Sequence, residues 1–150
     1  MNKQPTCKER INGELASRID DLRQLWEAYS NQNTPTSTED GNIIGGDMDG
    51  AHIYEYGLCF DYVAPGTFKK QQRGYFRYQL SWGGPSDEFR FYAEGNGYRW
   101  HVDRIEYWFL DWWDGAKRTL SGARFNLLEE IFQFLFAETG AAQAEFEKAQ

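Results

Sequence analysis

The stretch GYFRYQLSWGGPSDEFRFY, residues 74–92, decides the fold of this chain. On both sides of GGPS, aromatic and aliphatic residues alternate with charged and polar ones, and this period of two is typical of a β-strand with one buried face. The sequence GGPS itself predicts a tight turn. We therefore expect a β-hairpin whose rings face a core and whose charges face water or a partner while pairing across strands.

The alternation assigns the residues of this region to two faces. The core-facing set is Phe76, Tyr78, Leu80, Trp82, Phe89, Phe91 and Ala93, and the opposite set is Tyr75, Arg77, Gln79, Ser81, Glu88, Arg90, Tyr92 and Glu94. A second turn follows at GNG, residues 95–97. In the next strand, the apolar residues first occupy even-numbered positions, Tyr98, Trp100 and Val102. Further along they occupy odd-numbered positions, Ile105, Tyr107 and Phe109. A bulge near Asp103 and Arg104 restores the register and turns Trp108, Leu110 and Trp112 to the charged face.

Three segments precede the hairpin. Residues 6–29 have a capping-box spacing at Thr6 and Glu9, followed by apolar residues at gaps of three and four, which predicts an amphipathic helix. Residues 31–50 mix Pro, Gly, Thr, Asn and Asp without periodicity, which indicates a long acidic loop. From His52 the period changes to two, which predicts a strand whose core face is Tyr54, Tyr56, Leu58, Phe60 and Tyr62.

The C-terminal part predicts a turn, a strand and a helix. Asp114 and Gly115 have the composition of a hairpin turn, and the following AKRTL is expected to return as a short fifth strand. Residues 123–137 predict a helix that ends before Gly140 and is apolar around most of its circumference. Either the first helix or a second copy of the chain covers this surface, so a homodimer through the C-terminal helix stays open. Residues 141–150 are expected to be a loosely attached tail.

These elements predict one α+β domain over residues 1–150. It consists of an antiparallel meander sheet of four to five strands, with the N-terminal and C-terminal helices on one face. The other face of the sheet is expected to be open. A chain of this length can bury a core without disulfides or metals.

Charge is distributed unevenly along the chain, whose formal net charge is −7. No Lys or Arg occurs between Arg23 and Lys69, where the acidic residues are Glu27, Glu39, Asp40, Asp47, Asp49, Glu55 and Asp61. Basic residues gather in the hairpin region instead. Because an acidic chain repels phosphate backbones, we expect no direct binding of nucleic acid and favour binding to a basic protein surface.

The sequence contains no apolar signal region and no stretch of about 20 apolar residues, so we expect a cytoplasmic protein without a membrane partner. Cys7 and Cys59 are expected to be reduced thiols. We expect no cofactor and no metal. The Asp47, Asp49 and His52 cluster lacks the further ligands of a calcium loop and is interpreted as a solvated acidic turn.

Two groups of residues keep an enzymatic alternative open. Cys59 with His52 or His101 contains the residue types of a thiol nucleophile and its base. His101 and Asp103 are spaced as a hydrogen-bonded acid/base pair on one strand. However, no elbow, helix N-terminus or family signature surrounds Cys59, and arginines explain Asp103 equally well. The favoured interpretation is therefore a protein that is not an enzyme.

Three tryptophans fall within the six residues 108–113, in the sequence EYWFLDWWDG, residues 106–115. They cannot all point into one core from one strand, so some are exposed or are covered by the loop of residues 31–50. Exposed tryptophan beside acidic groups is typical of a protein-binding hot spot. The predicted partner-binding residues are Asp47, Asp49, Glu55, Asp61, Trp108, Trp112 and Trp113.

The strings YEYGLCFDYVAPGTF, GYFRYQLSWGGPSDEFRFY and EYWFLDWWDGA resemble small accessory proteins of plasmids, integrative elements and phages. This resemblance implies an inhibitor of host defence of the anti-CRISPR or antirestriction type. Such a protein would act by DNA mimicry, with carboxylates in a groove meant for phosphates and indoles anchoring the contact. The alternatives are an immunity protein that neutralises a toxin, and a small enzyme using Cys59 or His101 with Asp103.

Overall fold

The first helix, α1 (Cys7–Ser30), forms because its apolar residues recur on one stripe. Its buried residues are Cys7, Ile11, Leu15, Ile19, Leu22 and Trp26. The backbone N–H of Glu9 donates to Thr6 Oγ1 at 3.2 Å, which confirms the predicted capping interaction at the N-terminus of this helix.

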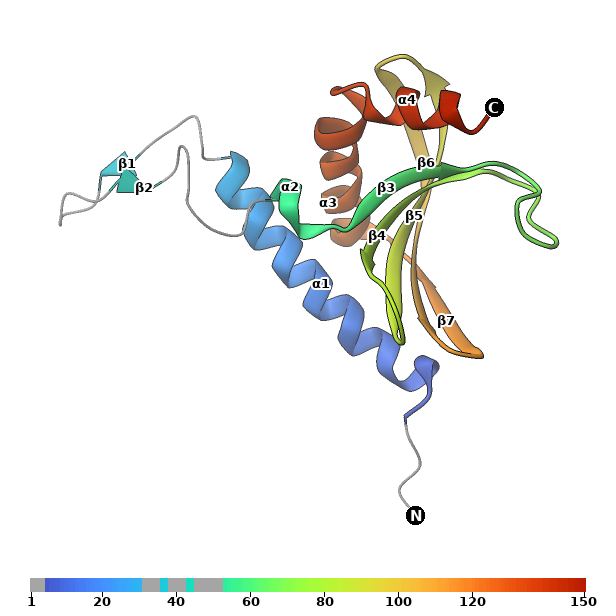
Figure 1. Cartoon of the computed structure of the whole chain (residues 1–150). Coiled ribbons are helices and arrows are strands. Elements are labelled where there is room, and N and C mark those ends of the chain that lie inside the picture. Colours follow the sequence, from blue (N-terminus) through green and yellow to red (C-terminus); the bar gives the residue numbers. More distant parts are fainter. Residues whose placement is uncertain (1–4, 31–35, 38–42, 45–52) are drawn as a thin grey trace.

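A computed structural model describes residues 5–30, 36–37, 43–44 and 53–150 (Figure 1). Its main sheet has five antiparallel strands in the order β3-β4-β5-β6-β7, which confirms the predicted α+β meander. The strands are β3 (Cys59–Val63), β4 (Tyr75–Ser81), β5 (Ser86–Asn96), β6 (Arg99–Asp111) and β7 (Asp114–Thr119). Two short strands, β1 (Thr36–Ser37) and β2 (Ile43–Ile44), pair with each other.

The remaining helices pack with α1 on one face of the sheet (Figure 1). They are α2 (Ile53–Tyr56), α3 (Gly122–Phe132), which continues as a π-helical turn (Gln133–Ala137), and α4 (Ala141–Lys148). The opposite face of the sheet carries none of these helices. Among the described residues, no helix therefore covers this side of β3 to β7.

A bulge in β6 explains why its apolar residues change from even-numbered to odd-numbered positions. Tyr92 of β5 pairs with Arg104, whereas the next residue, Ala93, pairs with Val102, so Asp103 is an extra residue in β6. Val102 and Ile105 are both buried as a result. This confirms the bulge that the sequence predicts and keeps the apolar residues of the long strand on the helical side.

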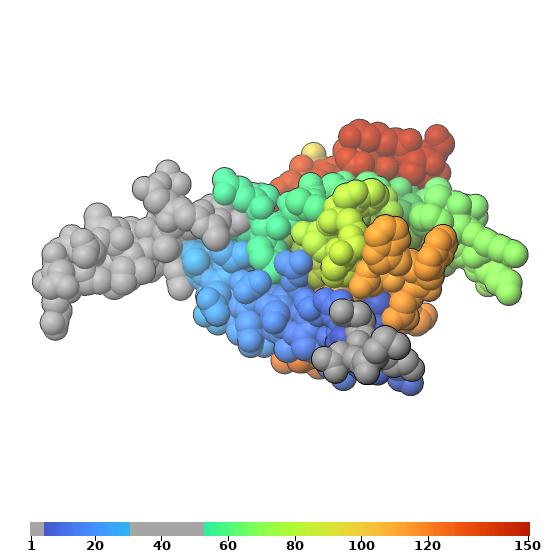
Figure 2. All heavy atoms as spheres, turned by 60° about the horizontal axis from the view of Figure 1, so that its bottom comes forward, coloured from blue at the N-terminus to red at the C-terminus, as the bar shows by residue number. Residues whose placement is uncertain are grey.

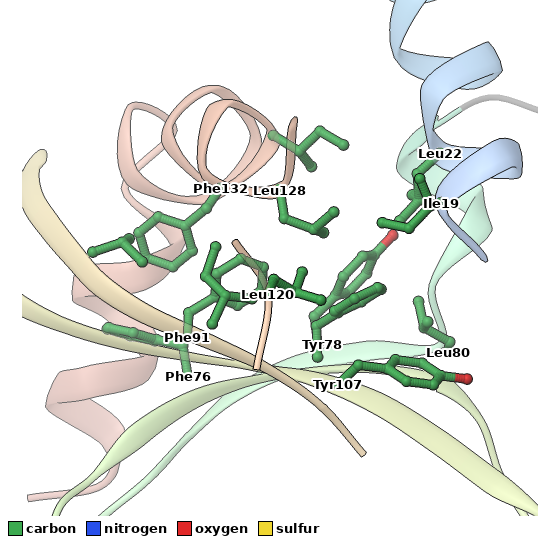
Figure 3. Close-up of a cluster of buried hydrophobic side chains, with 14 of the residues drawn as sticks. Ile19, Leu22, Phe76, Tyr78, Leu80, Phe91, Tyr107, Leu120, Leu128 and Phe132 are labelled. Carbon is green, nitrogen blue, oxygen red and sulfur yellow. The ribbon is translucent and has the colours of Figure 1, made fainter. Parts of the chain in front are cut away.

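Aromatic rings fill the space between the sheet and the helices (Figure 3). The Phe132 ring of α3 lies 5.5 Å from that of Phe76 and 4.9 Å from that of Phe91, measured between centroids. All three residues are fully buried. The core therefore depends on large, stiff side chains packed in specific orientations.

The prediction of a strand from His52 is wrong over the described residues 53–56, which form the short helix α2. Ile53 is buried in the core, whereas the Tyr56 hydroxyl donates to Asp21 of α1 at 2.7 Å. These contacts with α1 outweigh the alternating pattern, and β3 begins only at Cys59. Phe60 and Tyr62 pack against the core as predicted.

Three further expectations need correction. Asp111 pairs with Asp114, so the β6–β7 turn consists of Trp112 and Trp113 instead of Asp114 and Gly115. The side chain of Asp114 is occupied as an acceptor for the backbone N–H of Cys7 at 2.7 Å. Trp82 and Tyr98, which were expected to face the core, are exposed because each lies beyond the end of a strand.

The C-terminal residues pack more closely than the sequence suggests. In α4, Ala142 is fully buried, and the Phe146 ring lies 5.0 Å from Tyr62 and 5.5 Å from Trp100. The Trp26 ring of α1 lies 5.5 Å from the Phe134 ring in the π-helical turn. The first helix thus covers part of the apolar surface of the predicted C-terminal helix. This is one of the two alternatives considered for that surface, the other being a second copy of the chain.

Candidate functional site

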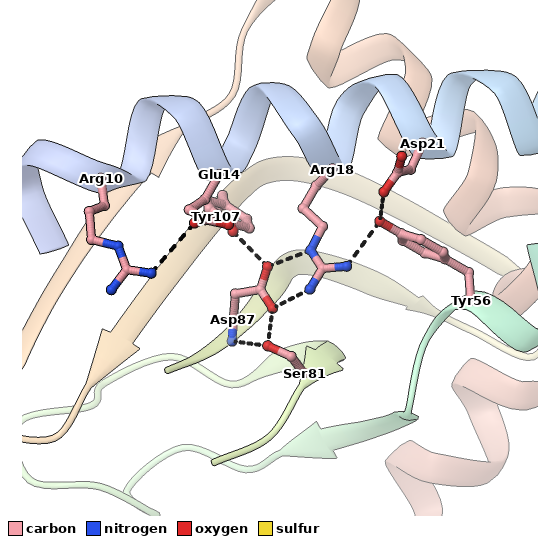
Figure 4. A network of polar contacts seen from close by, with 8 residues as sticks. All are labelled: Arg10, Glu14, Arg18, Asp21, Tyr56, Ser81, Asp87 and Tyr107. Carbon is pink, nitrogen blue, oxygen red and sulfur yellow. Dashed lines mark hydrogen bonds and ion pairs between the residues drawn. The ribbon is translucent and has the colours of Figure 1, made fainter. Parts of the chain in front are cut away.

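A polar cluster lies between α1 and the sheet (Figure 4). Asp87 of β5 is almost completely buried and accepts hydrogen bonds from Arg18, Tyr107 and Ser81. Burial, together with the bond to Asp87, raises the pKa of Tyr107 above its usual range. Because the carboxylate is satisfied by groups of the chain itself, this cluster fastens the helix to the sheet and offers no site for a ligand.

The centre of the open face is built around Glu106 of β6, whose exposed fraction is only 1%. Its carboxylate accepts hydrogen bonds from Tyr92 at 3.0 Å and from the Trp108 indole at 3.1 Å, and it forms an ion pair with Arg104 at 2.6 Å. Burial opposes ionisation, but these donors and Lys117 nevertheless hold the pKa of Glu106 below its usual range. Glu106 therefore fixes two aromatic side chains on the open face.

Two arginines complete the pattern on this face. Arg77 forms a bidentate pair with Asp61 at 2.7 and 3.0 Å, and Arg90 bonds Glu88 at 2.8 Å. The guanidinium of Arg90 also lies 3.7 Å from the Trp108 ring centroid and 4.6 Å from that of Tyr75. Most of the carboxylates here are thus neutralised by neighbours, while the rings are stacked on cations.

A groove of about 560 Å³ runs along this face. Its walls come from the strands and from the β3–β4 loop, residues 64–74, and they include Phe68, Lys69, Lys70, Tyr75, Tyr92, Trp82, Trp108 and Leu110. This volume is within the range of about 300–1,000 Å³ that is usual for small-molecule sites. Five of these residues are aromatic, so the groove combines apolar walls with positive charge at the loop.

Three exposed indoles lie at one end of the sheet, and we call them the tryptophan tip: Trp82, Trp112 and Trp113. Their exposed fractions are 79%, 86% and 100%. The β4–β5 turn and the β6–β7 hairpin lie side by side in Figure 2, in yellow-green and orange. A Cβ atom on Gly84 would stand 3.1 Å from Trp112 Nε1, which confirms this proximity. The tip continues the groove, since Trp82 lines it as well.

The structure brings together only some of the predicted partner-binding residues. Trp108 and Asp61 lie on the open face, and Trp112 and Trp113 form the hairpin turn at its end. Glu55 is an exposed residue of α2, which packs against α1 in the helical layer. The predictions for Asp47 and Asp49 lie outside the described residues.

The candidate catalytic residues Cys59 and Asp103 both have other partners, and the prediction for His52 lies outside the described residues. Cys59 Sγ donates to Gln79 Oε1 at 3.3 Å, and burial together with Asp61 raises the pKa of this thiol. The carboxylate of Asp103 forms a bidentate pair with Arg73 at 2.6 and 2.8 Å, which occupies it. Within residues 5–30, 36–37, 43–44 and 53–150, no cluster of His, Cys, Asp and Glu could hold a metal ion.

Sequence reasoning missed Phe68, Tyr75 and Trp82 as residues of a site. Tyr75 follows the alternating pattern, but nothing in that pattern distinguishes a groove from a flat face. The one available signal was the basic KKQQRG segment, residues 69–74, which was interpreted only as a turn. Folding brings this segment over the open face.

Comparison of the chain with protein-family models, with curated proteins and with solved structures finds no match. Among the described residues, no helix has both the length and the apolar character needed to cross a membrane. The open face and the tryptophan tip are therefore the features of the molecule from which we infer a function.

Proposed function

We propose that this chain is a non-enzymatic inhibitor that binds a basic, nucleic-acid-handling protein and inserts its tryptophan tip into that partner. The observation that carries the proposal is the exposure of Trp82, Trp112 and Trp113 at one end of the sheet. Tryptophan is strongly enriched among the residues that dominate binding energy at protein interfaces. Large indoles exposed together on two hairpin turns are typical of an interaction surface.

The turns hold these indoles in place before binding. Trp112 has a φ of 54°, a conformation that few non-glycine residues adopt, within a two-residue turn between paired strands. Asp111 of the same hairpin lies 3.6 Å from Arg10, and Asp114 accepts the N–H of Cys7, so the hairpin is tied to α1. The loss of conformational entropy at these side chains when a partner binds is therefore smaller.

Charge supplies the second part of the proposal. The chain carries a net charge of −7, and its acidic block between Arg23 and Lys69 contains Asp47, Asp49 and Glu55. Such a block favours association with a basic partner and speeds the encounter at low salt. Asp61 contributes little, because its carboxylate is already paired with Arg77.

The indole contribution is tested with the double variant Trp112→Asn and Trp113→Ser, in which Asn tolerates the positive φ. The immobilised wild-type chain captures basic proteins from a host lysate, and the affinity of the captured protein for each variant is then measured. We expect the double variant to bind at least about 30-fold more weakly, since the loss of even one hot-spot residue costs about 2 kcal/mol or more. The control Tyr98→Ser removes a similarly exposed ring outside the tip. Equal binding by the double variant and the control would contradict the proposal.

The charge contribution is tested separately with Asp47→Lys and Asp49→Lys. We expect these reversals to slow association and to flatten the dependence of affinity on salt. If they leave both quantities unchanged, charge mimicry is wrong, whereas the tryptophan anchor can still hold.

A further inference from the structure

The hydroxyl of Tyr75 is buried without a hydrogen-bond partner. Tyr75 is 1% exposed, and within the described part of the chain its oxygen has nothing to donate to or to accept from. An unsatisfied buried polar group costs about 1–3 kcal/mol of stability. Burial also raises the pKa of Tyr75, so that the hydroxyl keeps its proton at neutral pH and can act as a donor. Tyr75 lines the groove on the open face.

Two lysines at the mouth of the groove also lack partners. Neither Lys69 nor Lys70 forms an ion pair among the described residues, whereas Arg77 and Arg90 in the same groove are paired with Asp61 and Glu88. The free positive charge of the groove is therefore concentrated at the β3–β4 loop. An anionic group is the ligand that would neutralise it.

The loop holds this pair of lysines in place. Gln71 anchors it: its side-chain oxygen accepts the N–H of Phe68 at 3.0 Å, and its amide nitrogen donates to Arg73 O at 3.0 Å. Lys70 adopts a left-handed φ of 65° at the turn. The cations are thus presented by a closed turn instead of an extended linker.

Aromatic walls extend from the lysines along the strands. Phe68, Tyr92, Trp82 and Trp108 line the groove, and Glu106 fixes Tyr92 and Trp108 through hydrogen bonds at 3.0 and 3.1 Å. Arginines already cover these last two rings: Arg90 lies 3.7 Å from the Trp108 ring centroid and Arg73 lies 5.4 Å from that of Tyr92. A planar ring would therefore stack on the exposed Phe68 and Trp82, which contributes about 1–3 kcal/mol. The walls accordingly favour a ligand that carries an aromatic ring next to its anionic group.

We propose that this groove binds a nucleoside monophosphate, with the phosphate at Lys69 and Lys70 and the base against the aromatic walls. A polar group of the ligand bonds to Tyr75 after the side chains that cover its hydroxyl, among them Arg90 at 4.6 Å from its ring centroid, have moved aside. The groove, at about 560 Å³, has the size of a small-molecule site. A single nucleotide is favoured over a nucleic acid strand, because the net charge of −7 repels a long polyanion. This site shares Trp82 with the tryptophan tip, whereas Trp112 and Trp113 are not among the residues that line it.

The test is isothermal titration of the whole chain with AMP, GMP, CMP and UMP, compared with adenosine and inorganic phosphate. We expect at least one nucleotide to bind at least about tenfold more tightly than either fragment, because the ring and the anion contribute at separate places. Equal binding of phosphate alone, or no binding of any nucleotide, overturns the proposal. Tighter binding of an eight-residue oligouridylate than of UMP also overturns it, in favour of a strand-binding face.

Variants locate the site. Tyr75→Phe should weaken nucleotide binding about fivefold, since a hydrogen bond between neutral groups contributes about 1 kcal/mol. This variant should leave the melting temperature of the free protein unchanged or raised, since it removes an unsatisfied hydroxyl.

The double variant Lys69→Ala and Lys70→Ala should weaken binding of the nucleotide but not of adenosine. Tyr98→Phe and Lys8→Ala serve as controls away from the groove. Unchanged nucleotide affinity in Tyr75→Phe and in the double lysine variant overturns the assignment.

Discussion

Arg18 of α1 and Asp87 of β5, which are 69 positions apart in the sequence, form a bidentate ion pair. Nε donates to Oδ2 at 2.7 Å and Nη2 donates to Oδ1 at 2.9 Å. Tyr107 donates to the same carboxylate at 2.6 Å, and Arg18 also donates to the Tyr56 hydroxyl at 3.0 Å. The pair therefore links α1, α2 and two strands of the sheet.

Replacing Asp87 by Ala should destabilise the fold by about 1–3 kcal/mol, because it leaves the buried Tyr107 hydroxyl without its acceptor and removes two hydrogen bonds from the half-buried Arg18. Urea unfolding at pH 7 measures the difference. The control Asp20→Ala removes an exposed carboxylate that lies 3.6 Å from Arg23 and should change stability by less than about 0.5 kcal/mol. A loss for Asp87→Ala no larger than that of the control would mean that the pair does not fasten the helix.

Glu106 should make the stability of the fold depend on pH in the acid range. Its pKa in the folded state lies below the ordinary value of 4.5, so its contribution is complete above that pH. It is lost as the pH falls through the lower, folded-state pKa. Glu106→Gln should be about 1–3 kcal/mol less stable than the wild type at pH 7, since it removes charge-assisted bonds.

Urea unfolding of both proteins between pH 7 and pH 2 checks this expectation. The gap between wild type and Glu106→Gln should shrink as the pH falls below 4.5, because the wild-type carboxyl becomes neutral as well. Glu94→Gln, a change at an exposed carboxylate of the neighbouring strand, should show no such convergence. A gap that stays constant with pH would assign the effect of Glu106→Gln to packing instead of charge.

The sequence predicts those elements in which every residue of a face has the same environment. Alternation assigns Phe89 and Phe91 to the core, and the parity change between Val102 and Ile105 locates the bulge at Asp103. In both cases a single physical property, burial against one helical layer, repeats along the strand. The order of the five strands followed from short connections.

Elements whose conformation depends on distant contacts were not predictable. Residues 53–56 alternate like a strand, but Ile53 enters the core and Tyr56 bonds α1, so the segment is helical. The candidate site could not be predicted for the same reason. The loop at residues 64–74 lies beside Tyr92 and Trp108 only after folding, and no local pattern encodes that proximity.

Phe146 should hold α4 against the sheet. Replacing it by Ala removes ring contacts with Tyr62 and Trp100 and should cost about 1–3 kcal/mol, less than the roughly 3–5 kcal/mol for a fully buried Phe. Hydrogen exchange followed by mass spectrometry should show faster exchange in α4 but not in β5. The exposed change Glu147→Ala is the control. If α4 in the wild-type protein already exchanges as fast as an unfolded peptide, the expectation of a loosely attached tail is right.

The reactivity of Cys59 separates a binding protein from the enzymatic alternative. Burial and the nearby Asp61 raise the pKa of this thiol above its ordinary value of 9.0, so little thiolate exists at neutral pH. In a Cys7→Ala background, the rate of alkylation by iodoacetamide should keep rising beyond pH 9. Gln79→Leu, which removes the acceptor of the thiol hydrogen bond, should change this profile only slightly. A rate that levels off below pH 8 would reveal an activated thiolate and would favour the enzyme over the inhibitor, since a nucleophilic cysteine requires a lowered pKa.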